Sequence, residues 1–191
     1  MNTSTLSKIL TSLVLATAIA LMGMFGTSAP TAYAQQGTPS PNAPRATAGA
    51  KLAEFNKQMY DRAQNMLKSL QQIIDKANQA ANKAQEWTGE AKAKGLNTAE
   101  IESALATFKT QIAAAQESYD SAKATLDAHA GFDNNGNVTD REQARQTILA
   151  VGKSVREARQ TLVKATVDFQ KTVREQLKKF REDNRSATPK P

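Results

Sequence analysis

Apolar residues recur at steps of three and four along most of this chain, from Leu52 to Phe180. Such spacing keeps one face of an α-helix apolar, whereas a half-buried strand needs alternation at every second residue. Only two short segments rich in Gly and Asn, 95–97 and 131–137, interrupt the repeat. The sequence therefore predicts an all-α protein with three long amphipathic helices, at about 47–94, 98–130 and 139–183.

The connections between these helices are short, and short connections place neighbouring helices antiparallel. The predicted architecture is therefore an up-down-up bundle of three helices. The apolar stripes are heptad-like and, in the first helix after Ala77, mostly alanine, so coiled-coil-like packing with closely approaching helices is expected. The second helix carries more acidic than basic residues and the other two are basic, which favours a position for it between them.

Each interruption contains residues suited to ending one helix and starting the next. Gly95 suits the left-handed position after a helix end, and Asn97 suits an N-cap with Glu100 at the reciprocal third position. In the second interruption, Thr139 and Glu142 have the spacing of a capping box that opens the third helix.

Residues 1–34 have the pattern of a secretory signal peptide. Lys8 precedes a largely apolar stretch without a charged residue at 9–25, and the segment ends in Ala32-Tyr33-Ala34. We therefore expect export across the cytoplasmic membrane, cleavage between Ala34 and Gln35, and a mature protein in the periplasm, at the cell surface or outside the cell. The alternative is a retained membrane anchor, for which the apolar stretch is nearly long enough.

The mature chain would begin with a Pro-rich flexible leader at 35–46 and end in a disordered tail at 184–191. It has no cysteine, which excludes disulfides, thiolate chemistry and a lipoprotein anchor. Without Lys8, 24 basic residues stand against 18 acidic ones, a net charge of +6. This charge favours anionic partners.

The predicted helices differ in length, at about 70 Å for the first and third and about 50 Å for the second. The first should extend about 14 residues, and the third about 12, beyond the second at opposite ends. Both extensions continue the apolar stripe. We therefore predict that they bind a second copy of the chain or another helical protein, or that they fold back, through Leu52, Phe55, Met59, Val173, Leu177 and Phe180.

A basic row runs beside the apolar stripe of the third helix. Its members are Lys164, Lys171, Arg174, Lys178, Arg181 and Arg185, at steps of seven, three, four, three and four. A basic amphipathic helix can lie on an anionic membrane surface or bind an acidic polymer. The alternative is an ordinary solvated face, since Glu175, Glu182 and Asp183 are interspersed.

The second interruption also contains residues with the spacing of calcium ligands. Asp133, Asn135 and Asn137 have the one-three-five spacing of EF-hand ligands. The sixth position of such a loop would be Val138 and the twelfth Ala144, where glycine and a bidentate Glu are needed. A helix-capping turn without metal is the preferred interpretation.

His129 is the only histidine, and without cysteine or a nearby carboxylate cluster it does not form a zinc site. We expect it to pack at the end of the second helix and to cap the last carbonyl groups there; a pH-sensing role is the alternative. Trp87 and Tyr119 lie on the apolar stripes, where a core role is favoured over ligand stacking.

Neither paired carboxylates in a pocket nor a Ser/His/Asp set can be assembled from these residues, so no enzyme activity, cofactor or small-molecule substrate is expected. The primary hypothesis is an envelope or secreted interaction protein that presents helical faces or self-associates. A monomeric binder of acidic lipid, polysaccharide or extracellular nucleic acid is the main alternative. A holdase-like chaperone using the apolar extensions is the third.

Overall fold

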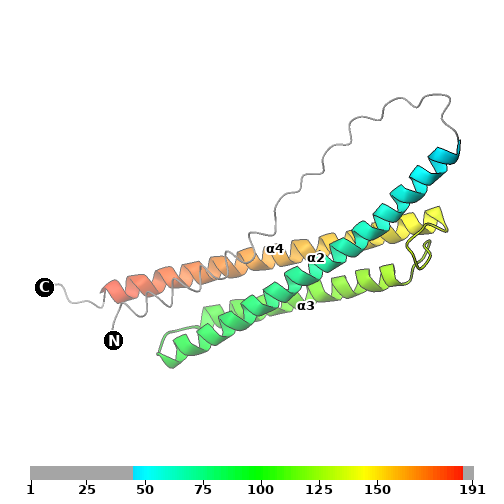
Figure 1. Cartoon of the computed structure of the whole chain (residues 1–191). Coiled ribbons are helices and arrows are strands. Elements are labelled where there is room, and N and C mark those ends of the chain that lie inside the picture. Colours follow the sequence, from blue (N-terminus) through cyan, green and yellow to red (C-terminus); the bar gives the residue numbers. More distant parts are fainter. Residues whose placement is uncertain (1–44, 187–191) are drawn as a thin grey trace. The chain divides into compact units, whose positions relative to one another are not determined.

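A computed structural model of the chain describes the backbone of residues 45–186 and the side chains of residues 57–182. It contains the helices α2 (Arg45–Ala93), α3 (Ala99–Asp127) and α4 (Arg141–Ser186) (Figure 1). The described residues form no β-strand, only an isolated bridge between Phe132 and Val138. The all-α prediction is confirmed. The predicted signal peptide at 1–34, most of the leader predicted at 35–46 and most of the tail predicted at 184–191 lie outside the described residues. Residues 45–46 and 184–186 belong to α2 and α4, so the leader and the tail were predicted two and three residues too long.

The turn between α2 and α3 occupies only a few residues. Gly95 has a φ of 79°, as predicted for the left-handed position after a helix end. The backbone N–H of Gly95 donates to the carbonyl of Lys92, and that of Leu96 donates to Ala91. These two bonds form a Schellman motif, which satisfies carbonyl groups that the end of α2 would leave unpaired.

The start of α3 differs in detail from the predicted capping box. α3 begins at Ala99, and the Asn97 side chain accepts a hydrogen bond from the Ala99 N–H at 3.2 Å. The carboxylate that returns to the cap is Glu102, which accepts a bond from the Thr98 hydroxyl at 2.9 Å. The predicted Glu100 instead contacts α4, because its side chain points toward Gln176 and Lys179.

The turn between α3 and α4 is longer and is closed by its own hydrogen bonds. The Gly131 carbonyl accepts bonds from the N–H groups of Thr139 and Asp140, so the chain doubles back on itself. α4 begins at Arg141, and its N-cap is Asp140, whose carboxylate accepts from the Gln143 N–H at 3.0 Å. The predicted cap at Thr139 is therefore wrong by one residue.

The chain divides into two compact units, each containing part of all three helices. In the first, Gln71–Glu117 combines with residues from Ala158 onward. Most of the buried side chains that α2 contributes to its core after Ala77 are alanines, whereas the other two helices contribute larger side chains. Among these, Phe108 of α3 stacks on Phe169 of α4, with ring centroids 5.1 Å apart. The fully buried side chains of this unit include Ile74, Ala77, Ile101, Ala115, Ala158 and Leu162.

In the second unit, α2 up to Leu70 combines with Ser118–Glu157. Tyr60 is its aromatic centre, with ring centroids 4.9 Å from Phe132 and 5.7 Å from His129. Other buried apolar residues of this unit include Ala63, Leu67, Leu70, Leu126, Val151 and Val155.

Two positions on the apolar stripes were weighed as ligand-stacking residues. Trp87 is buried, in agreement with the expected core role, whereas Tyr119 is only partly buried. Within the part of the chain that the structure describes, no helix combines the length and apolar character needed to cross a membrane.

Candidate anion-binding face

The part of α4 in the first unit sorts its side chains onto two opposite faces. Its apolar stripe is buried, and five of the predicted basic residues are exposed: Lys164, Lys171, Arg174, Lys178 and Arg181. At about 100° per residue, these five fall within a strip about 100° wide on the side opposite the buried stripe. We call this strip the basic face. The sixth predicted member, Arg185, has a side chain outside the described residues.

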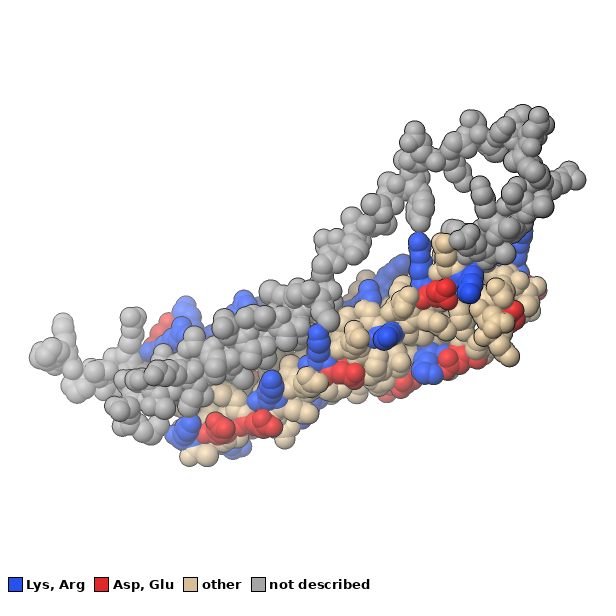
Figure 2. All heavy atoms as spheres, in the orientation of Figure 1, with Lys and Arg blue, Asp and Glu red and all other residues tan. Residues whose placement is uncertain are grey.

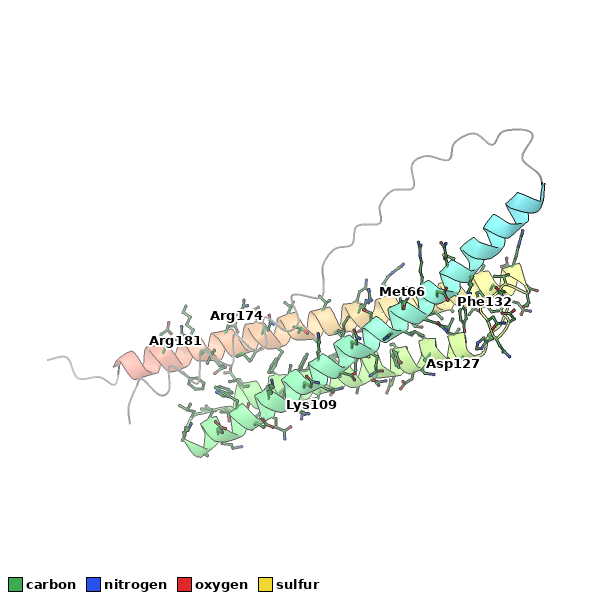
Figure 3. All side chains as sticks on the ribbon, viewed as in Figure 1. Met66, Lys109, Asp127, Phe132, Arg174 and Arg181 are labelled. Atoms are coloured by element: carbon green, nitrogen blue, oxygen red, sulfur yellow. The ribbon has the colours of Figure 1, made fainter. Side chains whose placement is uncertain are left out.

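The basic face keeps most of its charge. Figure 3 labels Arg174 and Arg181 on α4, and Figure 2 shows basic and acidic side chains interspersed over the visible surface. Among its ion pairs, Lys178 lies 3.9 Å from Glu182, both side chains being well exposed. Such a pair contributes at most about 1 kcal/mol and does not neutralise the face toward a third charge.

The neighbouring Lys179 has a different role from the basic face. Its ammonium group lies 3.2 Å from the Glu100 carboxylate, which also accepts a hydrogen bond from Gln176. This carboxylate therefore holds the first turn of α3 against α4. The basic row and the contact to α3 are thus separate parts of the helix surface.

Two aliphatic side chains accompany the basic face, and the sequence interpretation missed them. Val163 is 38% exposed and Val167 is 56% exposed. Val167 occupies the gap of seven residues between Lys164 and Lys171, on the same strip of the helix. The helical spacing of the basic row already indicated that Val167 lies among the basic residues. It was missed because valines on a helix are normally assigned to the core.

The expectation that the end of α4 exposes an apolar extension is wrong. Its three residues are buried: Val173, Leu177 and Phe180. The reason is the register of α3 on α4. Glu100 contacts Gln176 and Lys179, so the start of α3 lies further along α4 than the counted helix lengths predict.

At the other predicted extension, Met59 is partly exposed, and the side chains of Leu52 and Phe55 lie outside the described residues. The adjacent Tyr60 is buried against the turn between α3 and α4. A Cβ on Gly136 would lie 2.6 Å from the Tyr60 ring, which shows how closely the turn approaches α2. The turn therefore covers a stretch of α2 that was expected to lack a partner.

The turn uses its acidic residue as an internal acceptor. The Asp133 carboxylate accepts hydrogen bonds from the backbone N–H groups of Asn135 and Asn137, and from the Asn137 side chain at 2.9 Å. The bond from the Asn137 side chain is the main cause that lowers the pKa of Asp133. Oδ1 of Asp133 thus accepts from the backbone and Oδ2 accepts from the Asn137 side chain, as in a turn closed by its own side chain.

His129 contacts two groups through its ring nitrogens. Nδ1 lies 2.7 Å from the Asp127 carbonyl oxygen, and because a carbonyl only accepts, Nδ1 carries the proton. Nε2 lies 2.9 Å from the Tyr60 hydroxyl. The ring therefore caps a terminal carbonyl of α3, as expected, and also ties the turn to α2. His129 achieves this with a φ of 52°, which is uncommon for a residue other than glycine.

The described residues contain no group of three or more His, Cys, Asp or Glu side chains arranged to hold a metal ion. Comparisons with protein-family models, with curated proteins and with solved structures find no match. The basic face is therefore the candidate site that rests on this chain's own geometry.

Proposed function

We propose that this chain is an exported, non-enzymatic helical protein that binds an anionic partner of the cell envelope through the basic face of α4. The observation that carries the proposal is the gathering of five exposed cations on one strip of a helix whose opposite side is buried. A buried stripe fixes the rotation of the helix, so the cations stay directed away from the core.

We further propose that the three helices form the up-down-up antiparallel bundle expected from the sequence, with coiled-coil-like packing. Contacts in the first unit support this arrangement. Glu102 pairs with Lys92 at 3.0 Å, and the later Lys109 bonds the earlier Gln85. In the same way, residues that come later in α3 contact residues that come earlier in α4, as the partners of Glu100 and Phe108 indicate.

The strength of the proposed binding can be bounded. Each Lys or Arg close to an anionic surface contributes roughly 1 kcal/mol at moderate ionic strength. Five such residues would supply roughly 5 kcal/mol, which corresponds to a dissociation constant of roughly 0.2 mM. The proposed binding is therefore reversible and sensitive to salt.

The primary hypothesis from the sequence was self-association through two apolar extensions. One of them offers no exposed apolar side chains, because Val173, Leu177 and Phe180 are buried. It would now depend on the start of α2 alone. A holdase-like role needs the same side chains and is weakened for the same reason.

The test uses residues 35–191, which include every residue that the structure describes, on immobilised heparin. Lys171→Glu with Arg174→Glu should elute at clearly lower salt than the unaltered chain. The matched control is Lys83→Glu with Lys94→Glu, two exposed cations of α2 and its turn with the same change in net charge. Equal loss in both double variants would show that net charge alone governs retention and would contradict a specific face.

A further inference from the structure

The basic face includes two aliphatic side chains that a purely electrostatic site does not need. Val163 and Val167 are two of the three large apolar side chains exposed in the described residues; the third, Leu149, belongs to the other unit. Exposed apolar side chains are common on protein surfaces when they are scattered. These two are one helical turn apart and lie among the cations of the basic face, so their position calls for a partner with an apolar part.

Aliphatic and basic side chains lie close together on the basic face. Val167 stands three residues after Lys164 and four before Lys171, and residues at these separations are neighbours on a helix surface, about 5–6 Å apart. From Val163 to Arg181 the strip extends about 27 Å along the helix axis. A ligand that covers it must therefore be extended, anionic and apolar below its charged layer.

Soluble polyanions meet only part of this description. A polysaccharide or a nucleic acid backbone pairs with cations but offers nothing to the valines, and single-stranded nucleic acid is held largely by stacking on exposed aromatic rings. In this unit Trp87 and Phe169 are buried, the latter against Phe108. An acidic lipid surface supplies both anionic headgroups and, directly beneath them, an apolar layer.

We infer that the anionic partner is an acidic phospholipid surface, on which α4 lies flat with Val163 and Val167 inserted between headgroups and with Lys164, Lys171, Arg174 and Lys178 paired to lipid phosphates. This inference rests on the proposed function and names its ligand. The long Lys and Arg side chains can reach outward around the shorter valines, so both contacts form together.

The experiment measures partition of residues 35–191 onto vesicles of pure phosphatidylcholine and onto vesicles with one-third phosphatidylglycerol, beside retention on heparin. One double variant, Val163→Ser with Val167→Ser, removes the aliphatic contacts and leaves every charge in place. A second, Val163→Ile with Val167→Ile, enlarges them. Circular dichroism and thermal unfolding of each variant check that the helices remain folded.

We expect the unaltered chain to prefer acidic vesicles, the Ser variant to lose about fivefold or more of this partition, and the Ile variant to gain. Heparin retention should stay the same in both. Unchanged vesicle partition in the Ser variant, or binding to heparin without binding to acidic vesicles, would overturn the lipid assignment and leave the basic face intact. Loss of neither ligand in Lys171→Glu with Arg174→Glu would instead overturn the proposed function.

Discussion

The two turns of this protein close in different ways. The turn between α2 and α3 uses two backbone hydrogen bonds and one glycine with positive φ, and a Cβ added to Gly95 would meet nothing within 4 Å. The turn between α3 and α4 has two glycines with positive φ, both closely packed. It is held from outside as well, because the Thr147 hydroxyl of α4 donates to the Ala130 carbonyl and Tyr60 of α2 packs on it.

A turn can therefore either be independent of the helices it joins or be part of their core. The first turn needs only the backbone preference of Gly95. The second is a packing element with buried residues of its own, Gly131, Phe132 and Gly136. Changes in it should therefore affect the whole second unit, and equivalent changes in the first turn should stay local.

The largest effect is expected for Gly131→Ala. Its φ is 84°, and a Cβ there would lie 2.7 Å from both the Ala144 Cα and the Asp140 carbonyl oxygen, so backbone atoms would have to move. We expect the free energy of unfolding, measured with urea, to fall by at least about 3 kcal/mol.

Gly152→Ala in α4 is the control for this change, since a Cβ there meets nothing within 4 Å. It should raise the free energy of unfolding by about 0.5–1 kcal/mol, the usual gain inside a helix. A Gly131→Ala variant as stable as the unaltered chain would show that the second turn is not packed as described.

A smaller effect is expected for Gly95→Ala in the first turn. The φ of 79° is unfavourable for alanine, but no neighbouring atom obstructs its Cβ. The free energy of unfolding should fall by about 1–2 kcal/mol, the cost of the left-handed conformation alone. A loss equal to that of Gly131→Ala would remove the distinction between the turns.

The smallest effect concerns Asp133 and depends on pH. Hydrogen bonds from Asn137 and Asn135 lower the pKa of this carboxyl below its ordinary value of 3.8. The ionised group therefore contributes stability above the unfolded pKa, and this contribution is lost as the pH falls through the folded pKa. Asp133→Asn should be less stable than the unaltered chain at pH 6, and the difference should shrink below about pH 4.

Thermal unfolding of both chains between pH 2 and pH 6 measures this difference. Glu117→Gln, an exposed position of α3, is a control that should follow the unaltered chain more closely. A difference between Asp133→Asn and the unaltered chain that does not vary with pH would contradict the role given to the carboxylate.

Much of the helical structure could be predicted from the sequence because it is encoded locally. The apolar period and Gly95 gave three helices whose ends lie within three residues of those observed. The N-caps were less certain, because several residues at each helix start can accept a backbone hydrogen bond. Asp140 rather than Thr139 accepts the bond from Gln143, for example.

The pairing of distant residues could not be predicted in the same way. Counting helix lengths ignores the space that a turn occupies. The second turn doubles back, so Thr147 rather than Arg141 lies beside Ala130, three residues after the end of α3. This difference moves α4 along α3 and buries the residues expected to be exposed. In contrast, the exposure of Val163 and Val167 agrees with their position on the helix opposite the buried stripe, and it was missed because valines on a helix are normally assigned to the core.

The contact of Tyr60 with the second turn has a consequence for the order of folding. Its partner His129 is 69 residues away in sequence, whereas Thr147 bonds Ala130 across only 17 residues. Contacts with short separation close with less loss of chain entropy, so within the second unit the turn and the start of α4 can close before Tyr60 of α2 reaches them. Tyr60 then packs on a surface that has already formed. Weakening the contact of Tyr60 with the turn should therefore mainly accelerate unfolding and leave the rate of folding almost unchanged.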